Sequence, residues 1–177
     1  ISLGLVGSEM CIRDSITTSD RLEFWLSQCR GARVFALDTE TTSVVARRAE
    51  LVGISMAFAD GKACYIPVAH LTGDQLDTTL VLNKITSLLS DPALTMVGHN
   101  LKYDLTVLEA VGLVPRCTIA DTMLMSYVLD AAGGRHDMDS LAKRILGVDT
   151  ISYEYVCGKG AKPVSYTHLR AHETQRN

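Results

Sequence analysis

The chain has 177 residues, of which 47% are hydrophobic and 21% charged, and its formal net charge is −3. This composition fits one globular domain with an attached tail and excludes collagen-like, low-complexity and fully disordered chains. The slight acidic excess excludes a protein that grips duplex DNA mainly by neutralising phosphates. The five cysteines form no CxxC motif and no Cys/His cluster, so neither a disulfide framework nor a zinc site is indicated. No apolar run is long enough to cross a membrane, and we expect a reduced, cytoplasmic protein without a membrane partner.

Both ends of the chain differ from its interior. Residues 1–15 (ISLGLVGSEMCIRDS) and 163–177 (PVSYTHLRAHETQRN) resemble peptides that arise when sequencing-adapter DNA is translated at the ends of short reads. This resemblance implies that both ends are non-native and that the native domain occupies residues 16–162. The alternative is that both are native extensions. We expect neither end to contribute a central strand or a site residue.

The first half of the interior predicts a helix and three strands. Apolar residues at helical spacing follow a candidate N-cap at Ser19, and Gly31 is expected to end this helix. Three runs rich in β-branched and aromatic residues then predict an antiparallel meander with a turn at Asp60-Gly61. These runs are residues 33–38, 50–60 and 62–69.

Helices alternate with short strands in the second half of the interior. Helices are predicted at 74–90, 101–112 and 138–147, a strand at 93–100, and a strand end that continues as a helix at 119–130. Three strands followed by alternating helix and strand indicate an α/β fold, with a mixed sheet flanked by helices.

Two acidic motifs can bring carboxylates together. Asp38 and Glu40 follow the first predicted strand, and because side chains alternate along a strand they point to one face. Asp104 lies just inside the helix after the fourth predicted strand and can project toward Asp38. Carboxylates this close repel one another unless a cation lies between them, and Mg²⁺ takes such oxygen ligands. Taken singly, each motif has a simpler interpretation. Asp38 and Glu40 would mark a solvated strand end or a helix N-cap, and Asp104 would be a first-turn acid favoured by the helix dipole.

In combination, the motifs resemble a known family. FALDTETTS and GHNLKYD are similar to the first and second motifs of the ribonuclease H-like 3′–5′ proofreading exonucleases. YIPVAH, DTMLMSYVLD and GRHDMDSLAKRILG resemble, in order and at similar spacing, the exonuclease domain of bacterial family A DNA polymerases. The resemblance covers about residues 33–162. It implies a ribonuclease H-like fold and a magnesium-dependent nuclease that removes 3′-terminal nucleotides from single-stranded DNA, within a monomeric DNA polymerase.

The resemblance also implies roles for the acids. Asp38 would bridge two divalent ions, Mg²⁺ in the first instance with Mn²⁺ or Zn²⁺ as alternatives. Glu40 would bind the ion on the side of the attacking water, and Asp104 would support the ion on the side of the leaving group.

Contacts to the substrate are implied for a second set of residues, namely Thr39, Val44, His99, Asn100, Tyr103 and Arg135. Val44 would lie near the terminal base and Arg135 would contact phosphate, while His99 stands where relatives carry Gln. Five of the six have simpler alternatives. In these, Val44 covers the end of the sheet, His99 is a satisfied core imidazole and Asn100 is a helix N-cap. Tyr103 is half-buried packing, and Arg135 is a solvated loop residue.

Other polar residues near these motifs are interpreted as structural. Asp121, Asp137 and Asp139 are expected to cap helices, because Asp accepts hydrogen bonds from the free N–H groups of a first turn. His136 is expected to form a structural hydrogen bond.

The third motif of the family, Tyr-x-x-x-Asp, is absent from the chain, and no Asp follows Asp149. We therefore expect a C-terminally truncated domain that is catalytically incomplete. A standalone ribonuclease D-like enzyme acting on RNA is the alternative enzyme, although we would not expect it to carry YIPVAH or GRHDMDSLA. A purely structural role in the polymerase is the non-enzymatic alternative, and the three acids argue against it.

Overall fold

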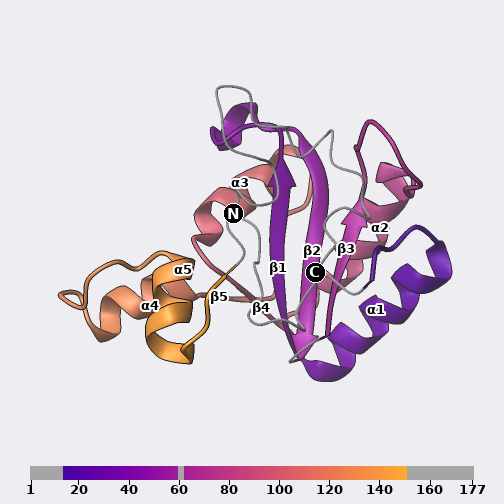
Figure 1. The fold of residues 1–177 in the computed structure, drawn as a ribbon. Coiled ribbons are helices and arrows are strands. Elements are labelled where there is room, and N and C mark those ends of the chain that lie inside the picture. The colour runs from indigo at the N-terminus through magenta and orange to yellow at the C-terminus, as the bar shows by residue number, and fades with distance from the viewer. Residues whose placement is uncertain (1–13, 60–61, 151–177) are drawn as a thin grey trace.

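The computed structural model describes residues 14–59 and 62–150, which form a mixed five-stranded sheet in the order β3-β2-β1-β4-β5 (Figure 1). The strands are β1 (Val34–Thr41), β2 (Leu51–Ala59), β3 (Lys62–Pro67), β4 (Thr95–Gly98) and β5 (Thr118–Asp121). The first three pair antiparallel, whereas β4 pairs parallel with both β1 and β5. The predicted meander and mixed sheet are confirmed, and the turn predicted at residues 60–61 lies outside the described residues.

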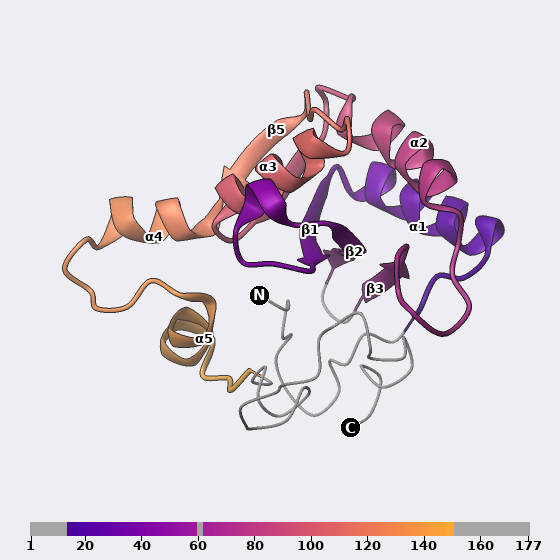
Figure 2. The same ribbon diagram turned by 90° about the horizontal axis from the view of Figure 1, so that it is seen from above.

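The helices are α1 (Ser19–Ala32), α2 (Thr78–Leu89), α3 (Leu101–Ala110), α4 (Thr122–Leu129) and α5 (Met138–Leu141). Two short turns accompany them, the 3₁₀ turn η1 (Ala46–Arg48) and the π turn η2 (Ala142–Leu146). Figure 2 shows α1, α2 and α3 along one face of the sheet, with α4 continuing from β5 away from it. None of the helices in the described ranges is long and apolar enough to cross a membrane.

Some element ends differ from the predictions because side chains cap different positions. Thr18, rather than Ser19, caps α1 by accepting a hydrogen bond from Arg21 N at 3.4 Å. The second helix begins at Thr78 instead of residue 74, where Asp77 Oδ1 accepts from Leu80 N at 2.9 Å. The helix predicted at 138–147 is divided into α5 and η2, and Gly147 ends it as expected with a φ of 71°.

The hydrophobic core lies between the sheet and helices α1 to α3. Alternation along β1 places Phe35 and Leu37 in this core, both almost fully buried, and directs Asp38 and Glu40 to the other face. Burying a side chain of this size stabilises the fold by about 1.5–3 kcal/mol. The central strand β1 is therefore firmly anchored on its helix-covered face while it presents acids on the other.

The described chain begins with an edge contact to β3. Tyr65 N donates to Asp14 O at 2.9 Å, Ile16 N donates to Tyr65 O at 2.8 Å, and Ile16 is fully buried. The Asp14 carboxylate also accepts from Trp25 Nε1 at 2.6 Å. Asp14 and Ser15 thus take part in the fold although they lie within the segment 1–15, because the outer edge of β3 offers backbone groups that need partners.

Candidate active site

The acids of the first motif lie on the central strand. Asp38 pairs with Ser55 of β2 and Glu40 with Gly53, so both carboxylates share the face turned away from α1 to α3. They are only 7% and 6% exposed. The sequence prediction that they share one face is confirmed by this register.

Asp104 approaches β1 from the helical side. It lies in the first turn of α3, is buried, and its Oδ1 accepts hydrogen bonds from Thr39 N at 2.9 Å and Thr39 Oγ1 at 2.6 Å. The turn before α3 is tight, since a Cβ on Gly98 would lie 2.2 Å from Leu101 Cδ2. Thr39, expected to contact substrate, is thereby a buried partner of Asp104.

Burial and mutual repulsion disfavour the charged forms of these acids. Burial, with the charges of Asp104 and Glu40, raises the pKa of Asp38 to about 8. Burial, with the charge of Asp104, raises the pKa of Glu40 to about 7. Burial also raises the pKa of Asp104, although its hydrogen bonds from Thr39 oppose the shift. The three carboxylates thus form one electrostatic unit.

This donor set fits a divalent cation in its chemistry. Asp38 Oδ2 is buried and has no hydrogen-bond partner among the described residues, which is unfavourable for a carboxylate without a cation. In the described ranges no three His, Cys, Asp or Glu side chains already surround a single ion position, and one oxygen of Asp104 is directed to Thr39. Magnesium sites commonly hold one or two protein carboxylates and complete the shell with water and phosphate, so the arrangement suits such a site.

Asp121 joins the two helices that flank the site, a role that sequence reasoning missed in part. Its carboxylate caps α4 as predicted, accepting from Met123 N at 2.9 Å. It also accepts from Leu101 N at 2.8 Å and Asn100 N at 3.1 Å, at the start of α3. Asn100 occupies the N-cap position of α3, as its alternative interpretation predicts, but its side chain makes no capping hydrogen bond. Its φ of 64° places it in the left-handed region, and the Asp121 carboxylate supplies the acceptor instead.

His99 is buried beside this junction. Its Nδ1 shares a hydrogen bond of 2.9 Å with Thr122 Oγ1, while its Nε2 is buried without a partner in the described part of the chain. The alternative of a satisfied core imidazole therefore holds for Nδ1 but not for Nε2 among the described residues.

Tyr103 holds the loop between β1 and β2. Its hydroxyl donates to Ser43 O and shares a hydrogen bond with Thr41 Oγ1, which agrees with the half-buried packing considered for it. Val44, next in the loop, is 93% exposed, so the alternative that it covers the sheet end is wrong. Tyr103 therefore fixes the backbone from which Val44 projects.

The same loop carries Arg47 and Arg48, which sequence reasoning did not single out. Both lie in η1, are exposed, and form no ion pair within residues 14–59 and 62–150. Turn η1 packs against α3, the helix of Asp104. Two adjacent arginines a few residues after Asp38 and Glu40 were the available sequence signal.

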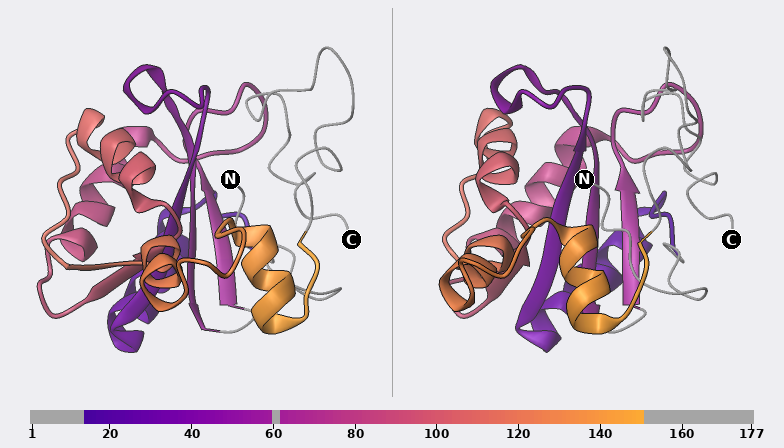
Figure 3. Two further views of the ribbon diagram at one scale, coloured as in Figure 1. Left: turned by 90° about the vertical axis from the view of Figure 1, so that its left-hand side faces the viewer. Right: turned by 60° about the vertical axis from the view of Figure 1, so that its left-hand side comes forward.

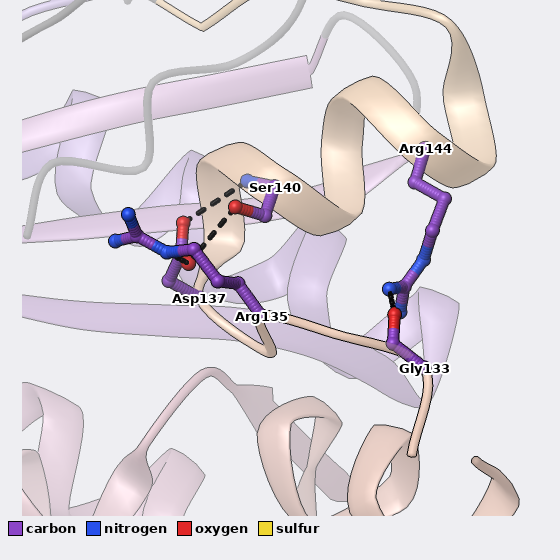
Figure 4. Close-up of polar contacts among 5 residues, drawn as sticks. All are labelled: Gly133, Arg135, Asp137, Ser140 and Arg144. Carbon is purple, nitrogen blue, oxygen red and sulfur yellow. Dashed lines mark hydrogen bonds and ion pairs between the residues drawn. The ribbon is translucent and has the colours of Figure 1, made fainter. Parts of the chain in front are cut away.

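Arg135 lies on the segment between α4 and α5 (Figures 3 and 4). Its side chain is 83% exposed, and Nε donates to Asp137 Oδ2 at 2.8 Å. Asp137 caps α5 as predicted, accepting from Ser140 N at 3.0 Å. Figure 4 also shows Arg144 donating to Gly133 O, a contact that closes the glycine-containing loop.

His136 and Asp139 complete this segment. His136 is buried, stacks on Tyr127 and shares a 2.8 Å hydrogen bond with Ser126 Oγ, which confirms its structural interpretation. Asp139 accepts from Thr150 Oγ1 at 2.6 Å and does not cap α5 through its side chain. That part of the prediction is wrong, because Asp137 already occupies the cap.

Comparisons with known proteins agree on one family for this chain. A model of a 3′–5′ exonuclease family matches residues 14–171. The chain is 42% identical over 161 residues to DNA polymerase I of Pseudomonas aeruginosa and 38% identical over 175 residues to that of Rhizobium leguminosarum. Each match covers 88% of this chain but only 18% and 17% of the relative, so the chain spans less than a fifth of these proteins.

Solved structures share the fold at lower identity. Ribonuclease D of Trypanosoma brucei is 18% identical with a TM-score of 0.66, covering 85% of this chain and 54% of that one. Brucella melitensis NrnC with bound Mg²⁺ is 20% identical with a TM-score of 0.59, covering 84% and 67%. These likenesses confirm the predicted ribonuclease H-like α/β fold.

Proposed function

Because the chain belongs to the 3′–5′ exonuclease family found in DNA polymerase I, we propose that it is part of the proofreading domain of a DNA-directed DNA polymerase. In its parent enzyme this domain hydrolyses 3′-terminal nucleotides from single-stranded DNA. The observation that carries the proposal is the electrostatic unit of Asp38, Glu40 and Asp104, three buried acids with raised pKa values on the elements that the family motifs predict.

The acids would hold two divalent cations, with Mg²⁺ preferred over Mn²⁺ and Zn²⁺. When bound, such a pair activates the attacking water and stabilises the departing 3′ oxygen. Asp38, with its buried and unpartnered Oδ2, would be shared between the ions. Glu40 would serve the side of the water and Asp104 the side of the leaving group, with Thr39 holding Asp104 in place.

The strand end would lie across the loop that follows β1. Val44 offers an exposed apolar surface for the terminal base, and Tyr103 fixes the loop beneath it. Arg47 and Arg48 would contact the phosphates, which gives a local basic site on a chain of net charge −3. His99, Asn100 and Arg135 stay proposed contacts to the last nucleotides and their phosphates.

The 177-residue chain would be catalytically incomplete, because it contains no Tyr-x-x-x-Asp. In the family this motif provides a further metal ligand and a tyrosine that aligns the water. Positioning and electrostatic stabilisation supply most of the acceleration in such chemistry, so the loss of both groups reduces the rate by several orders of magnitude. We expect the parent enzyme to act as a monomer in the cytoplasm, joined to its polymerase domain.

The test uses matched DNA and RNA single strands labelled at the 5′ end, with Mg²⁺ or Mn²⁺ at millimolar concentration. We expect the present chain to degrade both negligibly. A chain extended in its genomic frame through a native Tyr-x-x-x-Asp helix should shorten DNA from the 3′ end. Asp104→Ala should remove this activity.

Two outcomes would contradict the proposal. Faster degradation of RNA than of DNA by the extended chain would favour a ribonuclease D-like enzyme. Robust metal-dependent activity of the present chain, purified free of host nucleases, would falsify the claim that its site is incomplete.

A further inference from the structure

A buried tyrosine–histidine pair lies beside the acids. Tyr65 Oη and His70 Nε2 are 2.6 Å apart, and the rings meet edge to face at a centroid distance of 5.5 Å. The two residues are 3% and 8% exposed. Both belong to the motif YIPVAH, and neither has a role in the site described above.

Gly53 lets the tyrosine reach across β2. A Cβ on Gly53 would lie only 1.9 Å from Tyr65 Oη, so the phenol occupies the space of the missing side chain. Gly53 is directly opposite Glu40 in the antiparallel register. Since Cβ atoms of such pairs lie about 4.5–5.5 Å apart, Tyr65 Oη lies on the same face of the sheet as Glu40, roughly 3–7 Å from its Cβ. A carboxylate two bonds beyond that Cβ is within reach of the hydroxyl.

Electrostatics agree with this placement. Burial raises the pKa of the Tyr65 phenol, and the charge of Glu40 raises it further. The phenol therefore stays protonated beside Glu40 and retains a hydrogen that it can donate.

The histidine is held in place by its own backbone. His70 N donates to Gln75 Oε1 at 2.9 Å, and Gln75 Nε2 donates to His70 O at 3.0 Å. Just before it, Val68 N and Ala69 N both donate to Val52 O at 3.0 Å, next to Gly53. The backbone that carries His70 is thus fixed beside β2, the strand that separates Tyr65 from Glu40.

We propose that Tyr65 and His70 position the Glu40 carboxylate for the divalent cation through a directed chain of hydrogen bonds. His70 Nε2–H donates to Tyr65 Oη, and the Tyr65 hydroxyl hydrogen is then available to Glu40. Tyr65 and His70 are positioning residues, since they touch neither the cation nor the substrate. The inference rests on the proposed function, which assigns Glu40 to the metal site. Hydrogen-bonded partners behind a metal ligand typically contribute 10–100-fold to metal affinity.

The experiment measures binding of Mn²⁺ to the metal-free 177-residue chain, from the electron paramagnetic resonance of free Mn²⁺, together with the melting temperature. Tyr65→Phe keeps the ring over Gly53 and removes the hydroxyl, so we expect Mn²⁺ to bind at least about tenfold more weakly. His70→Gln retains an N–H donor and should keep the affinity within about threefold, whereas His70→Ala should match Tyr65→Phe.

His136→Ala is the matched control, because His136 is also buried and hydrogen-bonded to a hydroxyl, that of Ser126, away from the acids. It should lower the melting temperature and leave Mn²⁺ affinity unchanged. If Tyr65→Phe binds Mn²⁺ as well as the parent chain does, or if His136→Ala weakens it equally, the positioning role is overturned while the proposed function stands.

Two further measurements separate the remaining outcomes. If Asp38→Ala binds Mn²⁺ like the unsubstituted chain, the metal site itself is misplaced and both proposals fail. The nitrogen chemical shifts of His70 in the unsubstituted chain with Mg²⁺ test the pair without any substitution. The Nε2–H tautomer supports the proposed chain of hydrogen bonds, and the Nδ1–H tautomer overturns it.

Discussion

Asp38 occupies an unfavourable place for a charged side chain. It is buried, the charges of Asp104 and Glu40 add to the rise of its pKa, and its Oδ2 has no hydrogen-bond partner among the described residues. Positions of this kind cluster at functional sites, where the charge is needed when a cation or substrate is bound. The metal-free fold therefore carries an electrostatic cost that the proposed cation would remove.

This cost makes stability depend on pH in a defined direction. The pKa of Asp38 rises from 3.8 to about 8 on folding, so between about pH 4 and pH 8 the folded state binds more protons than the unfolded state. The metal-free chain should therefore lose stability as pH rises through this window, and Glu40, with a pKa raised to about 7, should add to the loss.

Asp38→Asn should weaken this pH dependence and raise the metal-free melting temperature at pH 8 by several degrees. It should also abolish the increase that millimolar Mg²⁺ or Mn²⁺ produces in the unsubstituted chain, since a cation bound only by the folded state stabilises it. Asp74→Asn, which removes the same charge from an exposed loop, is the control and should change neither property. A retained metal response in Asp38→Asn would show that the acids do not act together.

At the scale of elements, the site depends on how α3 and α4 are joined. The Asp121 carboxylate accepts hydrogen bonds from the first turns of both helices, so one side chain sets the start of the helix that carries Asp104. Loss of the carboxylate leaves free N–H groups at two helix ends instead of one.

Asp121→Ala should therefore cost about 2 kcal/mol of unfolding free energy, twice the roughly 1 kcal/mol of an ordinary N-cap. Asp137→Ala, which removes the cap of α5 alone, should cost about 1 kcal/mol and serves as the comparison. Urea unfolding monitored by circular dichroism measures both. Equal losses in the two variants would mean that Asp121 stabilises only α4.

For the whole molecule, the sequence-based boundaries lead to a deletion test. Removing residues 1–13 and 163–177 should leave the melting temperature nearly unchanged. Extending the N-terminal deletion through Ile16 should lower it by several degrees, because Ile16 is fully buried and its backbone pairs with Tyr65. A drop of several degrees in the shorter deletion would argue that the two ends belong to the native domain.

Periodicity and turn chemistry were enough to predict most elements of this fold. The alternation of β1, the apolar spacing of α2 and the positive-φ glycine at Gly147 are local properties, readable from neighbouring residues. Element ends were less accurate, since the caps Thr18 and Asp77 compete with equally suitable neighbours. The acids Asp38, Glu40 and Asp104 were identified from motifs whose spacing is also local.

Only the folded chain decides which distant groups meet. The bond from Thr39 to Asp104 spans 65 residues, and the reach of Tyr65 over Gly53 toward Glu40 depends on the register of three strands. The second cap made by Asp121 likewise joins residues 20 apart. Such contacts are set by strand pairing and helix packing, whose energy is summed over the whole core. Local residue patterns therefore predict the acids, whereas burial, pKa and hydrogen-bond partners follow from the three-dimensional arrangement.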